Sequence, residues 1–208
     1  RERFRNDRLL ASQHVSRLPA DDGGRRVHRA AARVLAALEA VFVLDPVPHL
    51  MRQYVPAADV VLRRDAENLS AAVASLLSDA RTREVIVSAL RRLNESDVVD
   101  VGTAESDLGD VMLTVRERVG DRTFDIPTRV MSDGTLRFLA VLSSVLQAPA
   151  ADAAAGSTSA DDAVGQSTVV IEELENGLHA SQASMLVAML RDEIARRRVR
   201  ALVTAHSP

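Results

Sequence analysis

The sequence lacks several residue types, and each absence excludes a class of chemistry. It has no cysteine, which excludes disulfides, thiolate metal ligands and cysteine nucleophiles. All 26 basic residues are arginine, so neither a lysine Schiff base nor a P-loop lysine can form within these 208 residues. Aromatic residues make up only 2%, so the core has to be built from leucine, valine and alanine.

Charge and hydropathy exclude further classes of protein. The net charge of -3 gives no electrostatic attraction to nucleic acid or to an anionic membrane. No apolar run approaches the roughly 18 residues of a membrane span. No signal peptide is recognisable, so we expect a cytoplasmic location and no membrane partner. The sequence begins at Arg1 without methionine and stops at "TAHSP" after a strand-like run, as expected of a fragment of a longer protein.

Residues 1–130 have the pattern of a helical lobe. Apolar residues at helical spacing predict helices over residues 25–40, 65–78 and 81–94. Three prolines in residues 41–59 predict an extended or looping segment there. Apolar residues partly alternate in residues 110–119, and Gly-Asp and then "RTFDI" follow them. This pattern predicts a hairpin near residues 110–126.

Residues 131–208 have the pattern of an α/β unit with a parallel sheet and flanking helices. "MSDGTLRFLAVLSSVLQ" predicts a loop that leads into a helix. Residues 148–167 are low in complexity, which predicts a mobile surface loop. The pattern predicts a strand at "TVVIE", a helix over residues 180–198 and a second strand at "VRALVT". Two strands joined by a helix in this way should be parallel. The carboxyl ends of both strands should meet at the edge where open α/β sheets bind ligands.

Polar side chains follow both predicted strands. Glu172 and Glu173 end the first strand, and His206 lies just past the second. Adjacent strand residues point to opposite faces, so one acid could orient a Mg²⁺ ion while the other faces a reacting phosphate. Each signal alone has a plainer interpretation: a solvated strand end for the acids, and a loop histidine for His206. Their order along the chain, with a helix between the strands, favours a nucleotide site.

Three stretches resemble the motifs of ABC-type ATPases. "TVVIEELENGLHA" resembles the Walker B strand and D-loop, "VMSDGTLRFLAVL" the signature motif with its helix, and "ALVTAHSP" the switch histidine. The residues of these motifs are most similar to those of the AAA-labelled predicted ATPases related to the overcoming-lysogenisation-defect (OLD) proteins. RecF and SMC ATPases are wider relatives. "AENLSAAVASLL" is similar to the segment before their signature. The resemblance implies part of a P-loop NTPase domain, and it is specific over residues 131–208.

The resemblance implies roles for the residues after the strands. Glu172 matches the acid that orients Mg²⁺, although aspartate is commoner there. Glu173 matches the catalytic base that activates water, and His206 matches the switch histidine.

It also implies roles at a dimer interface. Ser132, Asp133 and Gly134 match the signature, which contacts the γ-phosphate of an ATP held by the opposite subunit. Asp133 stands where the commonest signature has glycine. Ser132 could cap the helix and Gly134 could let a phosphate approach the backbone, although the three residues alone also fit a plain turn. Asn176 and Gly177 match the D-loop, which crosses the interface.

One motif of the family is missing from the sequence. No G-x-x-x-x-G-K-[ST] occurs, and we expect the P-loop to precede this chain. The resemblance implies binding and hydrolysis of ATP with Mg²⁺ by a head-to-tail pair of domains that acts as a nucleotide-gated clamp. This chain alone should be inactive. The alternative is a non-catalytic interaction module or half-domain that complements a P-loop partner. A nucleic acid or an effector protein would then be contacted by the rest of a longer chain.

Overall fold

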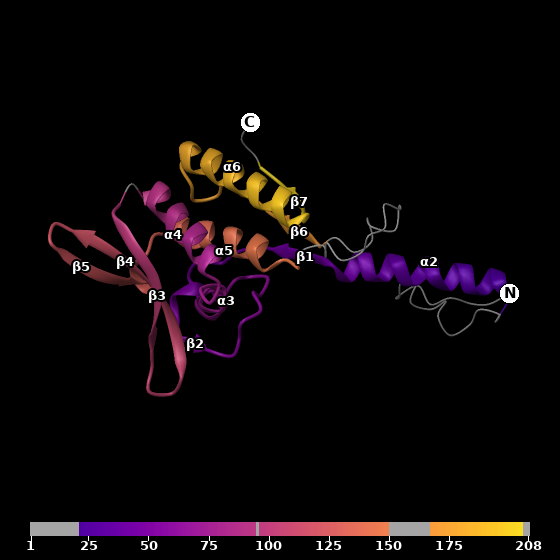
Figure 1. The fold of residues 1–208 in the computed structure, drawn as a ribbon, viewed down its shortest axis with the longest axis horizontal. Helices are drawn as coiled ribbons and strands as arrows, with labels where there is room; N and C mark the ends of the chain where they lie inside the picture. The colour runs from indigo at the N-terminus through magenta and orange to yellow at the C-terminus, as the bar shows by residue number, and fades with distance from the viewer. Residues whose placement is uncertain (1–20, 95, 150–166, 206–208) are drawn as a thin grey trace.

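The computed structural model of the protein describes residues 21–94, 96–149 and 167–205. Its strands form two sheets. A parallel sheet packs beside the helices of the core, and an antiparallel sheet projects from them (Figure 1). The surface loop expected over residues 148–167 lies almost entirely outside the described residues. Among the helices of the described part, none is long and apolar enough to cross a membrane.

The parallel sheet has the strand order β1-β6-β7, with β1 (Val41–Leu44), β6 (Thr168–Ile171) and β7 (Arg200–Val203). Helix α6 (Ala180–Arg197) joins β6 to β7, which confirms the predicted strand–helix–strand unit. The sequence predicts no strand in residues 41–59, yet β1 pairs with β6 along its whole length. The sheet therefore takes one strand from before residue 130 and two from after it.

The antiparallel sheet is built around β4 (Asp110–Val119). This strand pairs with β3 (Val98–Glu105), with β5 (Arg122–Pro127) and, at its start, with β2 (Val55–Pro56). β4 and β5 form a hairpin at the place that the sequence predicts, with Gly120 at φ +60° in the turn. The region before residue 130 is therefore a mixed α/β lobe, where the apolar spacing predicts a helical one.

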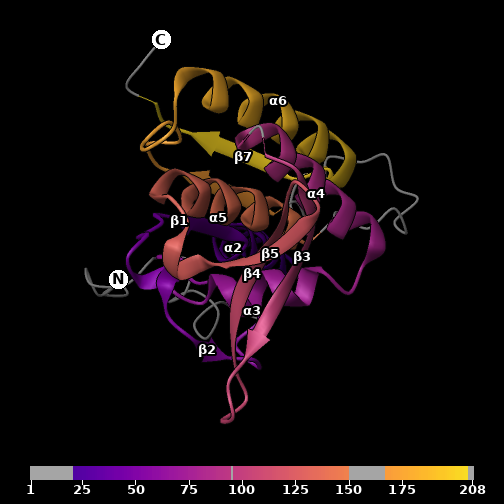
Figure 2. The same ribbon diagram turned by 90° about the vertical axis from the view of Figure 1, so that its left-hand side faces the viewer.

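Helix α5 (Asp133–Gln147) lies at the centre of the core. It packs against α3 (Leu69–Leu76), α4 (Ala80–Asn94) and α6, while α3 and α4 also contact the antiparallel sheet (Figure 2). Nearly all its residues from Gly134 to Leu146 are buried, on every side of the helix. A helix that is apolar all round has to be enclosed. The position of its first turn is therefore set by the packing of the whole core.

One further helix and two short 3-10 turns complete the described elements. Helix α2 (Asp22–Glu39) leads into β1 and extends away from the core (Figure 1). The 3-10 turns η1 (Leu50–Arg52) and η2 (Thr128–Val130) contact each other, which brings Arg52 next to the segment that enters α5. The three helices predicted before residue 130 are confirmed as α2, α3 and α4.

Asn68 organises the loop that leads into α3. Its side chain is fully buried, and Nδ2 donates hydrogen bonds of 2.7 Å to the carbonyl oxygens of both Asp59 and Val61. Its Oδ1 accepts a hydrogen bond of 2.9 Å from the N–H of Arg63. A buried amide is stable only when it is hydrogen-bonded. These three bonds therefore fix the course of residues 59–63 over the core.

We expect Asn68→Ala to lower the free energy of unfolding by about 2 kcal/mol, because two carbonyls and one N–H lose their partner. Urea unfolding followed by circular dichroism measures the change, since the chain has no tryptophan. Glu67→Ala is the control: it removes only an ion pair with the exposed side chain of Arg63 and should cost less than about 1 kcal/mol. Equal unfolding midpoints for Asn68→Ala and the unchanged chain would contradict this role.

Candidate functional site

Two acidic residues stand at the carboxyl end of β6. Glu172 and Glu173 follow Ile171 directly, and both are exposed. The N–H of Glu172 donates a hydrogen bond of 3.3 Å to the carbonyl of Leu44 at the end of β1. The N–H of Glu173 donates one of 3.0 Å to Oγ1 of Thr204, just past β7. The acids therefore lie between the carboxyl ends of both neighbouring strands, at the edge where open α/β sheets bind ligands.

Glu173 has a backbone conformation that few non-glycine residues adopt. Its φ of +49° lies in the left-handed region. Such conformations persist only where the surroundings hold them, and they concentrate at functional sites. Here the hydroxyl of Thr204 holds the N–H of Glu173, and Nδ2 of Asn176 donates a hydrogen bond of 3.2 Å to its carboxylate. Both the backbone and the side chain of Glu173 are therefore held in place.

Thr204 joins the end of β7 to the turn after β6. Its N–H donates to the carbonyl of Ile171 at 3.0 Å, its carbonyl accepts from the N–H of Leu174 at 3.2 Å, and its hydroxyl accepts from Glu173. The motif "TAHSP" draws attention to His206, and nothing in the sequence singles out Thr204. His206 itself lies outside the described residues, two positions further on.

Ser132 begins a second exposed turn, at the start of α5. Its Oγ accepts a hydrogen bond of 3.1 Å from the N–H of Thr135 and shares one of 2.8 Å with the Thr135 hydroxyl, so Ser132 caps the helix. A capped helix N-terminus presents the positive end of the helix dipole, which suits an anion. A cavity of about 330 Å³ opens beside this turn, with Val115 and Glu117 of β4 in its lining.

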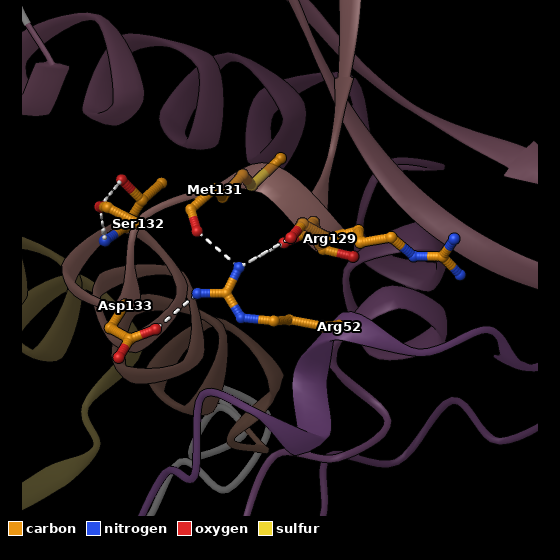
Figure 3. A network of polar contacts seen from close by, with 7 residues as sticks. Arg52, Arg129, Met131, Ser132 and Asp133 are labelled. Carbon is orange, nitrogen blue, oxygen red and sulfur yellow. Dashed lines mark hydrogen bonds and ion pairs between the residues drawn. The ribbon is translucent and has the colours of Figure 1, made fainter.

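Arg52 holds the same turn from within, as Figure 3 shows. Its Nη1 donates hydrogen bonds to the carbonyl oxygens of Thr128, Arg129 and Met131 at 3.2, 3.0 and 2.7 Å. Its Nη2 forms an ion pair with the carboxylate of Asp133. The partners lie between 76 and 81 residues further along the chain, so no local pattern in the sequence could indicate this contact.

The two turns touch at a pair of glycines. A Cβ on Gly134 would lie 2.4 Å from the carbonyl oxygen of Gly177, a distance that no real Cβ tolerates. Gly177 has a φ of +78°, which glycine adopts without strain. The sequence suggests that Gly134 leaves room for a phosphate, whereas the structure places the backbone of the same chain against it. The start of α5 is therefore in direct contact with the loop that follows Glu173.

Most of the residues that the sequence predicts for the site lie on these two touching turns: Ser132, Asp133 and Gly134 on one, and Glu172, Glu173, Asn176 and Gly177 on the other. Within the described residues, no group of three or more histidine, aspartate or glutamate side chains could hold a metal ion by itself. The oxygen donors at the edge of the sheet are two adjacent carboxylates, which could complete the coordination of an ion that also binds a substrate phosphate.

We expect Gly134→Ala to destabilise the protein by about 1–3 kcal/mol, because the added methyl forces the Gly177 carbonyl to move. Gly102→Ala is the matched control, since its Cβ would meet only Oγ1 of Thr114 at an ordinary 3.8 Å. Thermal unfolding of the two variants measures the difference. A Gly134→Ala variant as stable as Gly102→Ala would contradict the contact between the two turns.

Comparison with known proteins identifies the family. The model of the family described as "AAA domain, putative AbiEii toxin, Type IV TA system" matches residues 1–208. No curated protein and no solved structure matches the chain. Since the family model covers the whole sequence and the site carries acids at the carboxyl edge of a parallel sheet, the chain belongs to this family of AAA domains.

Proposed function

We propose that this chain supplies the signature, Walker B and switch segments of an ABC-type ATPase that binds and hydrolyses ATP as a nucleotide-gated dimer. Membership of an AAA family supports nucleotide binding and ATPase chemistry. The observation that carries the proposal is Glu173, which is exposed, held at a φ of +49° and placed at the carboxyl edge of the parallel sheet. A carboxylate fixed in this way suits a base that orients water beside a phosphate.

Each residue at the edge of the sheet has a distinct part in this proposal. Glu173 accepts the proton of the attacking water, while Asn176 and Thr204 keep its carboxylate and backbone in position. Glu172 offers an exposed carboxylate, the hard oxygen ligand that Mg²⁺ takes alongside substrate phosphates. When bound there, the ion would neutralise charge on those phosphates. His206 would donate a hydrogen bond to the γ-phosphate.

The second turn serves the nucleotide of another subunit in this proposal. Ser132, Asp133 and Gly134 form the signature, whose capped helix N-terminus contacts a γ-phosphate held by a second copy or a homologous domain. Asn176 and Gly177 lie in the D-loop at the interface. A head-to-tail pair then has two composite sites, and hydrolysis opens the pair.

The P-loop of this ATPase has to come from polypeptide outside these 208 residues, because they contain no lysine. The exposed edge of the parallel sheet supports this. Within the described residues, β7 pairs only with β6, and its Leu202 and Val203 are 60% and 39% exposed. Parallel sheets are normally covered on both faces, and open edges are normally paired or protected. A further strand beside β7 would complete the sheet next to Glu173.

In the complete ATPase, Glu173→Gln should retain ATP binding and ATP-driven dimerisation but lower turnover by about a hundredfold or more, because water loses its general base. Phosphate release measures turnover, and light scattering measures the dimer. Glu84→Gln, an equal change at an exposed position of α4, should keep normal turnover. Normal turnover in Glu173→Gln would remove Glu173 from this role.

The 208-residue chain alone should not bind ATP in the micromolar range, because it has no P-loop to hold the phosphates. Calorimetric titration with ATP and Mg²⁺ measures this, and circular dichroism shows whether the chain is folded. Micromolar binding by the folded chain would contradict the need for an external P-loop.

A further inference from the structure

The contacts of Arg52 all converge on the turn before α5. One guanidinium nitrogen binds three backbone carbonyl oxygens, and another binds the carboxylate of Asp133. The side chain of Arg52 is 24% exposed, whereas that of Asp133 is 66% exposed and lies at the surface of the turn. The planar fork of arginine can hold a carboxylate and several carbonyls at once, and a lysine ammonium cannot match this geometry.

Asp133 creates an electrostatic conflict at this turn. A carboxylate in the first turn of a helix is favourable for the helix itself, because it faces the positive end of the dipole. The same carboxylate repels any other anion that approaches that end. A turn meant to contact a phosphate therefore needs a nearby positive charge that neutralises Asp133. Arg52 supplies such a charge, because its guanidinium pairs directly with the carboxylate of Asp133.

The hydrogen bonds from Arg52 to the three carbonyl oxygens also favour the approach of a phosphate. Carbonyl oxygens carry partial negative charge and repel phosphate oxygens. Arg52 binds the carbonyl oxygens of Thr128, Arg129 and Met131. The side chain of Ser132 points away from Arg52 (Figure 3). The surface that Ser132 presents is therefore kept clear of these three oxygens.

We propose that Arg52 is a positioning residue for contact between this turn and a phosphate of a second subunit. It fixes the turn through three carbonyls and neutralises Asp133, so that the helix N-terminus can accept the phosphate despite its own acidic residue. The inference rests on the proposed function, because the phosphate belongs to ATP held by another copy. Arg52 does not touch that ATP itself.

The test compares single and double variants of the complete ATPase in the Glu173→Gln background, where ATP should hold the dimer closed. We expect Arg52→Gln to raise the ATP concentration needed for half-maximal dimerisation about tenfold, within the usual range of coupling between sites. ATP binding to the separate subunit should stay the same, because the P-loop is elsewhere. Asp133→Asn should tighten dimerisation, and adding it to Arg52→Gln should restore most of the loss.

A merely structural ion pair predicts a different pattern, in which Arg52→Gln and Asp133→Asn weaken dimerisation alike and the double variant shows no recovery. That pattern would overturn the inference, as would normal dimerisation by Arg52→Gln. Arg116→Gln is the matched control, since it breaks an exposed ion pair with Asp125 at 2.7 and 3.0 Å on the β4–β5 hairpin and should leave dimerisation unchanged.

Failure of this inference can be distinguished from failure of the proposed function. If Arg52→Gln is unfolded by circular dichroism, Asp133→Asn alone decides: tighter dimerisation supports the inference and weaker dimerisation contradicts it. If the Glu173→Gln protein does not dimerise with ATP at all, the proposed function fails. If it dimerises and the Arg52 variant behaves like its parent, only the role of Arg52 is wrong.

Discussion

The parallel pairing of β6 with β1 and β7 is the constraint on which the candidate site depends. It brings the carboxyl ends of three strands to one edge, where hydrogen bonds from Glu172 to Leu44 and from Glu173 to Thr204 tie the strand ends together. A residue held in the left-handed region costs free energy, and these cross-strand bonds supply the restraint that keeps Glu173 there. Without β7 alongside, the turn would lose Thr204 and relax.

Helix α5 connects the core to both turns of the site. Its residues are buried all round, so its position follows from the packing of α3, α4 and α6. Its first turn meets the loop after Glu173 at Gly134 and Gly177, and Asp133 in that turn pairs with Arg52. The two turns therefore meet at a backbone contact that leaves no room for a Cβ on Gly134.

The sequence predicts those parts of the fold and site that depend on local patterns. The apolar run of β6, the helical period of α6 and the acids at the strand end are all local. β3 could not be predicted in the same way, because its fully buried residues Val98 and Val101 are three positions apart and do not alternate. β1 directly precedes a proline-rich segment, and these prolines predict an extended or looping segment in place of a strand. Arg52 and Thr204 act through partners 76 and 31 residues away, which only the folded chain brings together.

In the proposed ATPase, Glu173 of one copy and Ser132 of another serve the same phosphate. A mixing experiment with the complete ATPase tests this shared site, using Glu173→Gln and Ser132→Arg proteins that are each inactive. Heterodimers would contain one intact composite site, so the mixture should regain about a quarter of the normal turnover, because half of the dimers are mixed and half of their sites are intact. A mixture as inactive as its two components would show that both residues act within one copy, which would contradict a site shared between two copies.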